Sequence, residues 1–165
     1  MAASAHASAR CGCTDPADCV DRRTGRYLTA VYWLEAAADD GQREYVRTGA
    51  VGERLGVTPA TVTEMFDRLA ADGLVTYEKH VGVALTDRGE TVGSELAWRQ
   101  CVVRTFFASE LGVEFDAGDG YQFGYVLPDH GVEELCALVD HPGGDCCGGG
   151  DEMEATDCRC VTRAD

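Results

Sequence analysis

The chain has 165 residues, enough for one compact unit, and carries 29 acidic against 14 basic side chains for a net charge of −15. It holds no run of about eighteen apolar residues, the length that spans a bilayer, and its first residues lack an apolar signal core. We therefore expect a cytoplasmic protein with no membrane segment, in a compartment where thiols stay largely reduced.

The first predicted unit, residues 1–22, is a flexible segment that contains three of the nine cysteines, Cys11, Cys13 and Cys19. Its composition, rich in glycine, aspartate and proline around the cysteines, cannot build a core of its own.

Residues 46–88 predict a winged helix-turn-helix inside a DNA-binding domain that spans residues 23–88. Thr48 is the expected cap of a short helix, and Gly56 its left-handed end. Thr58 then caps a second helix that starts at Pro59, because proline lacks only an amide hydrogen that would be unpaired there. The second helix has apolar residues at i, i+3, i+4 and i+7, namely Val62, Met65, Phe66 and Leu69.

After Gly73 the pattern changes to a strand, LVTYEK, then a turn at residues 80–82, then a second strand, VALT. Capped amphipathic helices occur in many small helical domains, so the helix pair alone is a weak signal. The hairpin that follows at the right distance favours a winged helix-turn-helix over a generic helical domain.

The open face of the second helix is short-chained near its N-terminus, as a helix entering the major groove requires. We expect contacts with base edges from Thr58, Pro59, Ala60, Thr61, Thr63 and Glu64. We expect contacts with backbone phosphates from Arg47, Arg68, Lys79 and His80. A salt bridge to Asp72 is the alternative for Arg68, and simple exposure to solvent is the alternative for His80.

Residues 89–140 predict a helical dimerisation domain, because a long helix begins after Thr86 and carries apolar residues that suit the first helix and a second subunit: Val92, Leu96, Val103, Phe106 and Phe107. A helix-turn-helix protomer contacts only a half-site, so a homodimer on a palindromic operator in double-stranded DNA is expected. Cys101 and Cys136 lie among apolar residues and are interpreted as small buried hydrophobes.

The last predicted unit, residues 141–165, is a cysteine-rich tail with Cys146, Cys147, Cys158 and Cys160. Four thiolates suffice for a tetrahedral zinc site or an iron-sulfur cluster, and Cys11 and Cys13 are further candidate ligands. The spacing matches no common zinc-finger or ferredoxin pattern. Metal or cluster binding, a thiol/disulfide switch and an inert solvated tail therefore all remain open.

From Tyr27 to about Leu138 the chain resembles the diphtheria-toxin-repressor and manganese-transport-repressor family of metal-dependent transcriptional regulators. The resemblance rests on YLTAVYWL, on VRTGAVGERLGVTPATVTEMFDRLAADGLVTYE, on GVALTDRG and on FFASELGV. It implies a homodimer that binds palindromic operators near metal-uptake genes. The positions that the family uses for its regulatory ions are here Arg26, Thr29, Gln100, Tyr121, Gly124 and Tyr125. None of these suits a divalent metal, since arginine is permanently charged and glycine has no side chain.

The acidic surplus lies away from the predicted DNA-contacting segment: residues 47–88 hold 5 basic and 6 acidic groups, whereas residues 89–165 hold 4 and 16. One lysine, Lys79, accompanies thirteen arginines, a composition that resembles proteins from halophilic organisms. In molar salt, DNA affinity rests more on shape and base contacts than on phosphate neutralisation. An acidic domain that avoids DNA is the alternative interpretation.

These observations predict a mainly α fold with a small β wing: a winged helix-turn-helix followed by a helical dimerisation domain. The predicted function is a transcriptional regulator, most simply a repressor, that responds to a transition metal (iron, zinc or manganese), an iron-sulfur cluster or thiol state. A general transcription factor with a structural zinc site and a metal-buffering protein are the alternatives. The sequence offers no arrangement of residues typical of an enzyme.

Overall fold

The computed structural model describes residues 18–38 and 45–139. The described part is mainly helical with one two-stranded antiparallel sheet, which confirms the predicted fold class. Its elements in chain order are α1 (Arg22–Ala36), α2 (Thr48–Leu55), α3 (Pro59–Ala71), β1 (Val75–Glu78), β2 (Gly82–Leu85), α4 (Asp87–Leu111), α5 (Ala117–Val126) and α6 (Asp129–Leu138).

The helix-turn-helix consists of α2 and α3. Gly56 ends α2 with φ of 66°, and Thr58 caps α3 by accepting a hydrogen bond from the Thr61 amide at 3.3 Å, both as predicted. The expected cap at Thr48 is wrong by one position, because Thr48 is already helical and Arg47 precedes it in an extended conformation. The cause is tertiary: the residue before Arg47, Val46, pairs with Val83 through two backbone hydrogen bonds and keeps the chain extended.

The wing is the hairpin of β1 and β2, in which Val75 lies opposite Leu85 and Glu78 opposite Gly82. Gly82 was expected in the turn but is the first residue of β2. A Cβ at this position would lie 2.4 Å from the Val46 carbonyl oxygen, so only glycine lets Val46 pair with the wing. The tip is therefore formed by Lys79, His80 and Val81.

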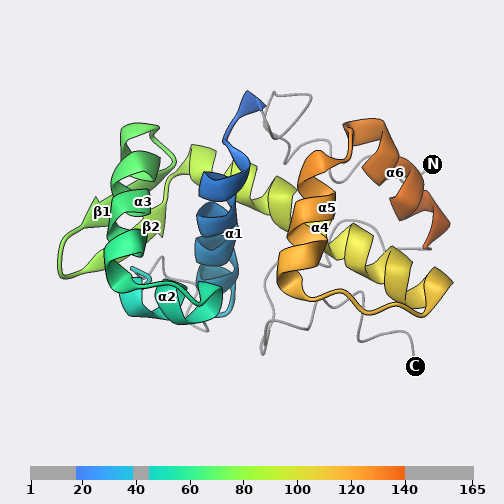
Figure 1. The fold of residues 1–165 in the computed structure, drawn as a ribbon. Coiled ribbons are helices and arrows are strands. Elements are labelled where there is room, and N and C mark those ends of the chain that lie inside the picture. Colours follow the sequence, from blue (N-terminus) through green and yellow to red (C-terminus); the bar gives the residue numbers. More distant parts are fainter. Residues whose placement is uncertain (1–17, 39–44, 140–165) are drawn as a thin grey trace.

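The long helix α4 connects two groups of helices (Figure 1). Its start is fixed by Thr86, whose hydroxyl accepts from the Gly89 amide at 3.1 Å and donates to the Gly73 carbonyl at 2.7 Å. Residues early in α4, such as Val92 and Leu96, complete the core formed by α1, α3 and the wing. Later residues form a second core with Trp33 and Val132, which includes Ala97, Trp98, Cys101 and Val102. Cys101 is thus a buried core residue as predicted, whereas Cys136, also predicted to be buried, is only half-buried and packs against the same core from its edge.

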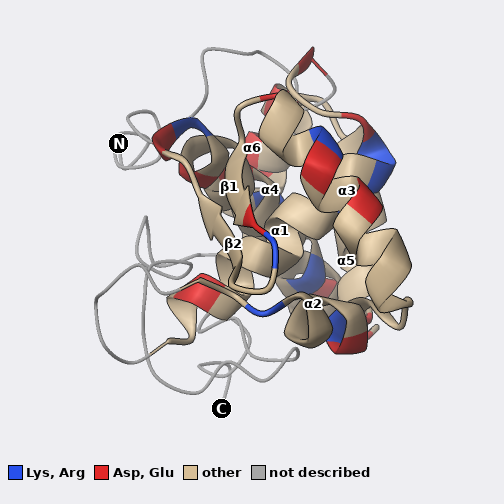
Figure 2. Cartoon of the chain, turned by 90° about the vertical axis from the view of Figure 1, so that its left-hand side faces the viewer, with Lys and Arg blue, Asp and Glu red and all other residues tan. Residues whose placement is uncertain are grey.

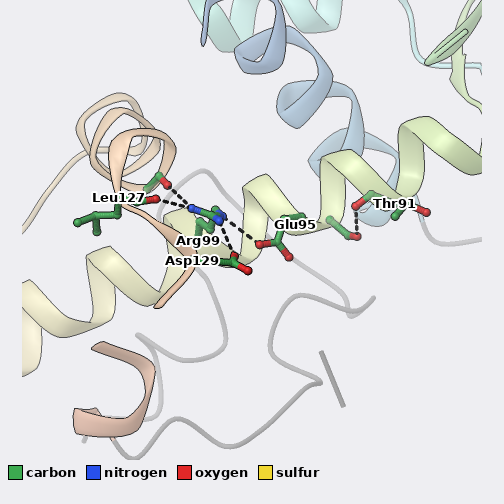
Figure 3. A network of polar contacts seen from close by, with 7 residues as sticks. Thr91, Glu95, Arg99, Leu127 and Asp129 are labelled. Carbon is green, nitrogen blue, oxygen red and sulfur yellow. Dashed lines mark hydrogen bonds and ion pairs between the residues drawn. The ribbon is translucent and has the colours of Figure 1, made fainter. Parts of the chain in front are cut away.

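A buried arginine links the helices at the far end of the fold. Arg99 of α4 donates to Glu95 at 2.9 Å, to the carbonyls of Gly124 and Leu127 at 3.2 and 2.7 Å, and to Asp129 at 2.6 Å (Figure 3). Because these acceptors lie in α4, at the end of α5 and at the start of α6, one guanidinium sets how the three helices meet.

Among the residues that the structure describes, no helix combines the length and the apolar character that crossing a bilayer would demand.

Candidate nucleic-acid interface

The first turn of α3 is packed against the core on one side and open on the other. Val62, Met65, Phe66 and Leu69 have no exposed surface, and they anchor α3 in the first core. On the other side of the helix, Thr58, Pro59, Ala60 and Glu64 are all exposed. The burial pattern therefore presents short side chains and one carboxylate to solvent at the N-terminus of α3, which is the geometry that a helix needs to approach base edges.

Two threonine hydroxyls are fixed within this turn. The Thr61 hydroxyl oxygen lies 3.0 Å from that of Thr58, and the Thr63 hydroxyl donates to the Pro59 carbonyl at 3.0 Å. Both side chains are half-buried. A hydroxyl that donates in this way keeps lone pairs free, so Thr63 offers an acceptor and a methyl group in defined positions.

The side chains predicted to contact phosphates all lie at exposed positions: Arg47 before α2, Arg68 on α3, and Lys79 and His80 at the wing tip. His80 has φ of 68°, a left-handed conformation that directs the chain round the tip. Arg68 forms no ion pair with Asp72 in the described part of the chain, and the Asp72 carbonyl accepts from Arg88 at 3.1 Å. Figure 2 shows basic and acidic residues interspersed over α2 and α3 on this side of the molecule.

Behind the helix-turn-helix lies a cavity of about 90 Å³, here called the interhelical cavity. Four of the six positions at which the sequence resemblance places metal ligands line it: Arg26, Thr29, Gln100 and Tyr121. Gly124 and Tyr125 do not line it, since the Gly124 carbonyl accepts from Arg99 and the Tyr125 hydroxyl donates to the Val20 carbonyl at 2.9 Å. Side chains that are distant in sequence thus meet where the resemblance predicts a metal site. The residues at these positions are not the residue types that bind divalent metals.

The sequence interpretation missed six residues of this cavity, of which Trp33 and Arg54 carry side-chain hydrogen-bond donors. Arg54 follows buried Val51 by three positions and precedes Leu55, so it lies on the inward side of a short amphipathic helix. This spacing is the one local signal in the sequence that Arg54 faces the interior. Burial lowers the pKa of the Arg54 guanidinium, although it remains charged. Burial also raises the pKa of Tyr121, whose hydroxyl stays neutral.

The interhelical cavity does not fit a divalent metal ion. No carboxylate, imidazole or thiolate is among its lining residues, which include two arginines. No cluster of three or more histidine, cysteine, aspartate or glutamate side chains suited to a metal occurs in residues 18–38 and 45–139. The predicted cysteine ligands, Cys11, Cys13, Cys146, Cys147, Cys158 and Cys160, lie outside the described residues.

Comparison with known proteins connects this geometry to a family. Residues 20–83 match the family described as "Iron dependent repressor, N-terminal DNA binding domain". The HTH-type transcriptional regulator MntR of Lysinibacillus sphaericus (strain C3-41) is 39% identical over 88 residues, which are 53% of this chain and 59% of that protein. MntR of Bacillus subtilis (strain 168) is 34% identical over 80 residues, 48% and 53% of the two chains. The chain therefore spans between half and three fifths of the length of these relatives.

Solved structures agree with the fold. A structure described as "Manganese-dependent transcriptional repressor complex with manganese" superposes with a TM-score of 0.61 at 26% identity, over 71% of this chain and 52% of that one. The structure of ScaR with bound Zn²⁺ gives a TM-score of 0.56 at 25% identity, over 81% and 61%. Together the comparisons show that residues 20–83 are similar to the DNA-binding domain of iron-dependent repressors, and that the described fold is similar to that of a manganese-dependent transcriptional repressor.

Proposed function

We propose that this chain is a sequence-specific, DNA-binding transcriptional regulator that acts as a repressor and not as an enzyme. The observation that carries the proposal is the first turn of α3, which is anchored by four fully buried apolar residues and exposes Thr58, Pro59, Ala60 and Glu64. The proposal is supported by the match of residues 20–83 to a DNA-binding domain and by relatives that are named transcriptional regulators.

In this proposal the residues divide into two roles. Thr58, Pro59, Ala60, Thr61, Thr63 and Glu64 contact base edges, where methyl groups suit thymine and the Glu64 carboxylate accepts from cytosine. Arg47, Arg68, Lys79 and His80 contact phosphates and fix the register on the duplex.

We further propose that two copies pair, in the cytoplasm of a high-salt cell, to contact the two halves of a palindromic operator. Support comes from apolar surface at one end of the molecule: Leu111, Val113, Phe123 and Val126 are 57, 43, 45 and 63% exposed. Phe123 also belongs to a set of stacked rings, in which the centroids of Phe107 and Phe115 lie 4.4 Å apart and those of Phe115 and Phe123 5.1 Å apart. Exposed apolar surface beside an ordered aromatic cluster is typical of a subunit interface.

The effector that we propose is a transition metal held by the cysteine-rich segments, with Cys146, Cys147, Cys158 and Cys160 as a four-thiolate set and Cys11 and Cys13 as further ligands. Support comes from relatives named for manganese and solved with Zn²⁺, together with the poor fit of the interhelical cavity to a metal. The metal regulates only if it binds the DNA-competent arrangement with a different affinity from the other.

Selection of duplexes from a random library by the purified full-length protein, in molar potassium chloride, tests DNA recognition. We expect a palindromic consensus, and at least tenfold weaker binding to it by Thr61→Glu and by Thr63→Glu. Ala71→Glu adds the same charge at the exposed C-terminal end of α3 and is the matched control. Equal binding by all three variants, with folding verified by circular dichroism, would contradict the proposal.

Metal analysis of protein purified anaerobically, with an absorption spectrum, tests the effector. Visible absorption indicates an iron-sulfur cluster, whereas a bound metal without colour is zinc or manganese, which the metal analysis distinguishes. We expect serine replacement of Cys158 and Cys160 to abolish the metal, while Cys101→Ser, at a buried core position, leaves the stoichiometry unchanged. Protein without metal, or metal retained after both replacements, would contradict this part.

A further inference from the structure

The interhelical cavity has a donor surplus that its own side chains do not satisfy. The Gln100 amide is used on both sides, accepting from the Trp33 indole at 3.1 Å and donating to the Ala117 carbonyl at 2.7 Å. The hydroxyls of Tyr121 and Thr29 donate to the carbonyls of Arg22 and Gly25, both at 2.8 Å. The hydroxyl donors of Tyr121 and Thr29 and both ends of the Gln100 amide are therefore already engaged within the protein.

The two guanidiniums differ from these groups. Among the described residues, neither Arg26 nor Arg54 has a hydrogen bond or an ion pair. Each guanidinium carries five N–H donors and no acceptor, and Arg54 is half-buried, where leaving a charge unpaired is costly. What the cavity lacks is an acceptor with negative charge.

The size of the cavity limits what that acceptor is. A volume of about 90 Å³ exceeds several times the roughly 10–15 Å³ that one water needs. It falls well short of the roughly 300 Å³ at which pockets for drug-sized ligands begin. The volume accommodates an inorganic oxyanion of the size of phosphate.

We propose that the interhelical cavity binds a small oxyanion through Arg26 and Arg54, at the place where members of this family are expected to hold a metal ion. The oxyanion accepts hydrogen bonds from both guanidiniums in the bidentate manner that arginine favours. In a chain of net charge −15, the site works because no carboxylate is among its lining residues, so the local charge opposes the overall one.

The position of the site gives the oxyanion a regulatory consequence, which rests on the proposed function. Arg26 belongs to α1 and Arg54 to α2. A Cβ at Gly52 of α2 would lie 3.6 Å from the Val62 side chain, so α2 and α3 are closely packed. An anion that links α1 to α2 therefore restricts the movement of the recognition helix relative to the rest of the fold.

Isothermal titration of the full-length protein with inorganic phosphate, at constant ionic strength maintained with chloride, tests the site. We expect saturable binding of one phosphate per chain, and affinity at least tenfold lower in Arg54→Gln and in Arg26→Gln. Arg23→Gln is the control, because Arg23 is an exposed arginine of α1, the helix of Arg26, and does not line the cavity. We expect its phosphate affinity to lie within twofold of that of the wild type. Sulfate in place of phosphate distinguishes a general oxyanion site, which binds both, from one specific for phosphate.

Arg26 is exposed, so Arg26→Gln keeps the test decisive if Arg54→Gln fails to fold. Absence of saturable binding of either anion, or equal binding by the wild type and Arg26→Gln, would overturn the proposal. The proposal would also be overturned if the wild type bound stoichiometric Mn²⁺ and both arginine replacements strengthened that binding. Such a result would make the cavity a cation site.

A second measurement separates this inference from the proposed function. With the selected duplex, we expect saturating phosphate to change DNA affinity at least threefold in the wild type and not in Arg54→Gln. Phosphate binding without DNA binding would contradict only the proposed function. DNA binding without phosphate binding would contradict only the oxyanion site.

Discussion

Nη2 of Arg99 lies 2.6 Å from Oδ1 of Asp129, so an arginine in the middle of α4 holds the first residue of α6. Arg99 is 1% exposed and its other partner, Glu95, is 7% exposed, whereas Asp129 is 32% exposed. The pair with Glu95 is therefore buried, and the pair with Asp129 is partly screened by water.

This difference predicts unequal losses of stability. Arg99→Met leaves the buried Glu95 carboxylate without its guanidinium and two carbonyls without a donor, so we expect the free energy of unfolding to fall by about 3–5 kcal/mol. Asp129→Asn removes a partly exposed charge but keeps an acceptor, and we expect a loss of about 1 kcal/mol or less. Denaturation by guanidinium chloride, followed by circular dichroism, measures both. Equal losses would show that the network does not depend on the buried pair.

Gly89 allows α4 to start against the wing. A Cβ at this position would lie 1.8 Å from the Leu74 carbonyl oxygen, which also accepts from the Thr86 amide at 3.1 Å and is not free to move. We expect Gly89→Ala to lower the free energy of unfolding by about 3 kcal/mol, at the upper end of the usual overpacking cost.

Gly49 is the matched control for Gly89. It lies in α2, and the position that a Cβ would occupy there has open space within 4 Å, so Gly49→Ala gains helix propensity without a clash. We expect a gain of about 0.5–1 kcal/mol. Loss of stability in both variants, measured by thermal unfolding, would contradict the steric explanation.

Asp21 makes stability depend on pH. Hydrogen bonds from the side chain and amide of Thr24 lower the pKa of Asp21 below its ordinary 3.8. Because the pKa is lower in the folded state, the contribution of Asp21 is present above pH 3.8 and is lost as pH falls through the lowered folded value. We expect the difference in Tm between wild type and Asp21→Ala to be constant near neutral pH and to shrink below about pH 4. A difference in Tm that grows as the pH falls would contradict stabilisation of the folded state by the ionised Asp21 carboxylate.

The apolar end of the molecule predicts the subunit interface. We expect Phe123→Glu, which places a charge among the exposed apolar residues, to convert the proposed dimer to monomers in sedimentation equilibrium and to weaken operator binding. Gln122→Glu adds the same charge at the neighbouring exposed position of α5 and serves as the control. A dimer that survives Phe123→Glu places the interface elsewhere.

The wing tip predicts how DNA binding depends on salt. If Lys79 contacts a phosphate, Lys79→Ala lowers the slope of log K against log salt by about one per contact and weakens binding to all sequences equally. Arg23→Gln, on the exposed surface of α1, leaves the slope unchanged. Fluorescence anisotropy at several potassium chloride concentrations measures the slope, and a changed base preference in Lys79→Ala would count against a phosphate contact.

Local chemistry determined the elements from the sequence alone. The cap at Thr58, the left-handed end at Gly56 and the start of α4 after Thr86 each depend on atoms within a few residues of one another, so a short stretch of sequence specifies them. The error at Thr48 marks the limit of this approach. There a pairing of Val46 with Val83, far along the chain, overrode the local preference.

Which side chains meet depends on how the helices pack. Trp33 and Gln100 are 67 residues apart, and Arg54 faces the same cavity from another helix, so no local pattern reveals their proximity. The sequence showed that the metal-ligand positions had changed, but not that Arg26 and Arg54 share a cavity whose neutral polar groups are already hydrogen-bonded. The physical reason is that capping is a short-range interaction within one element, whereas the charge balance of a cavity is set by the packing of several helices.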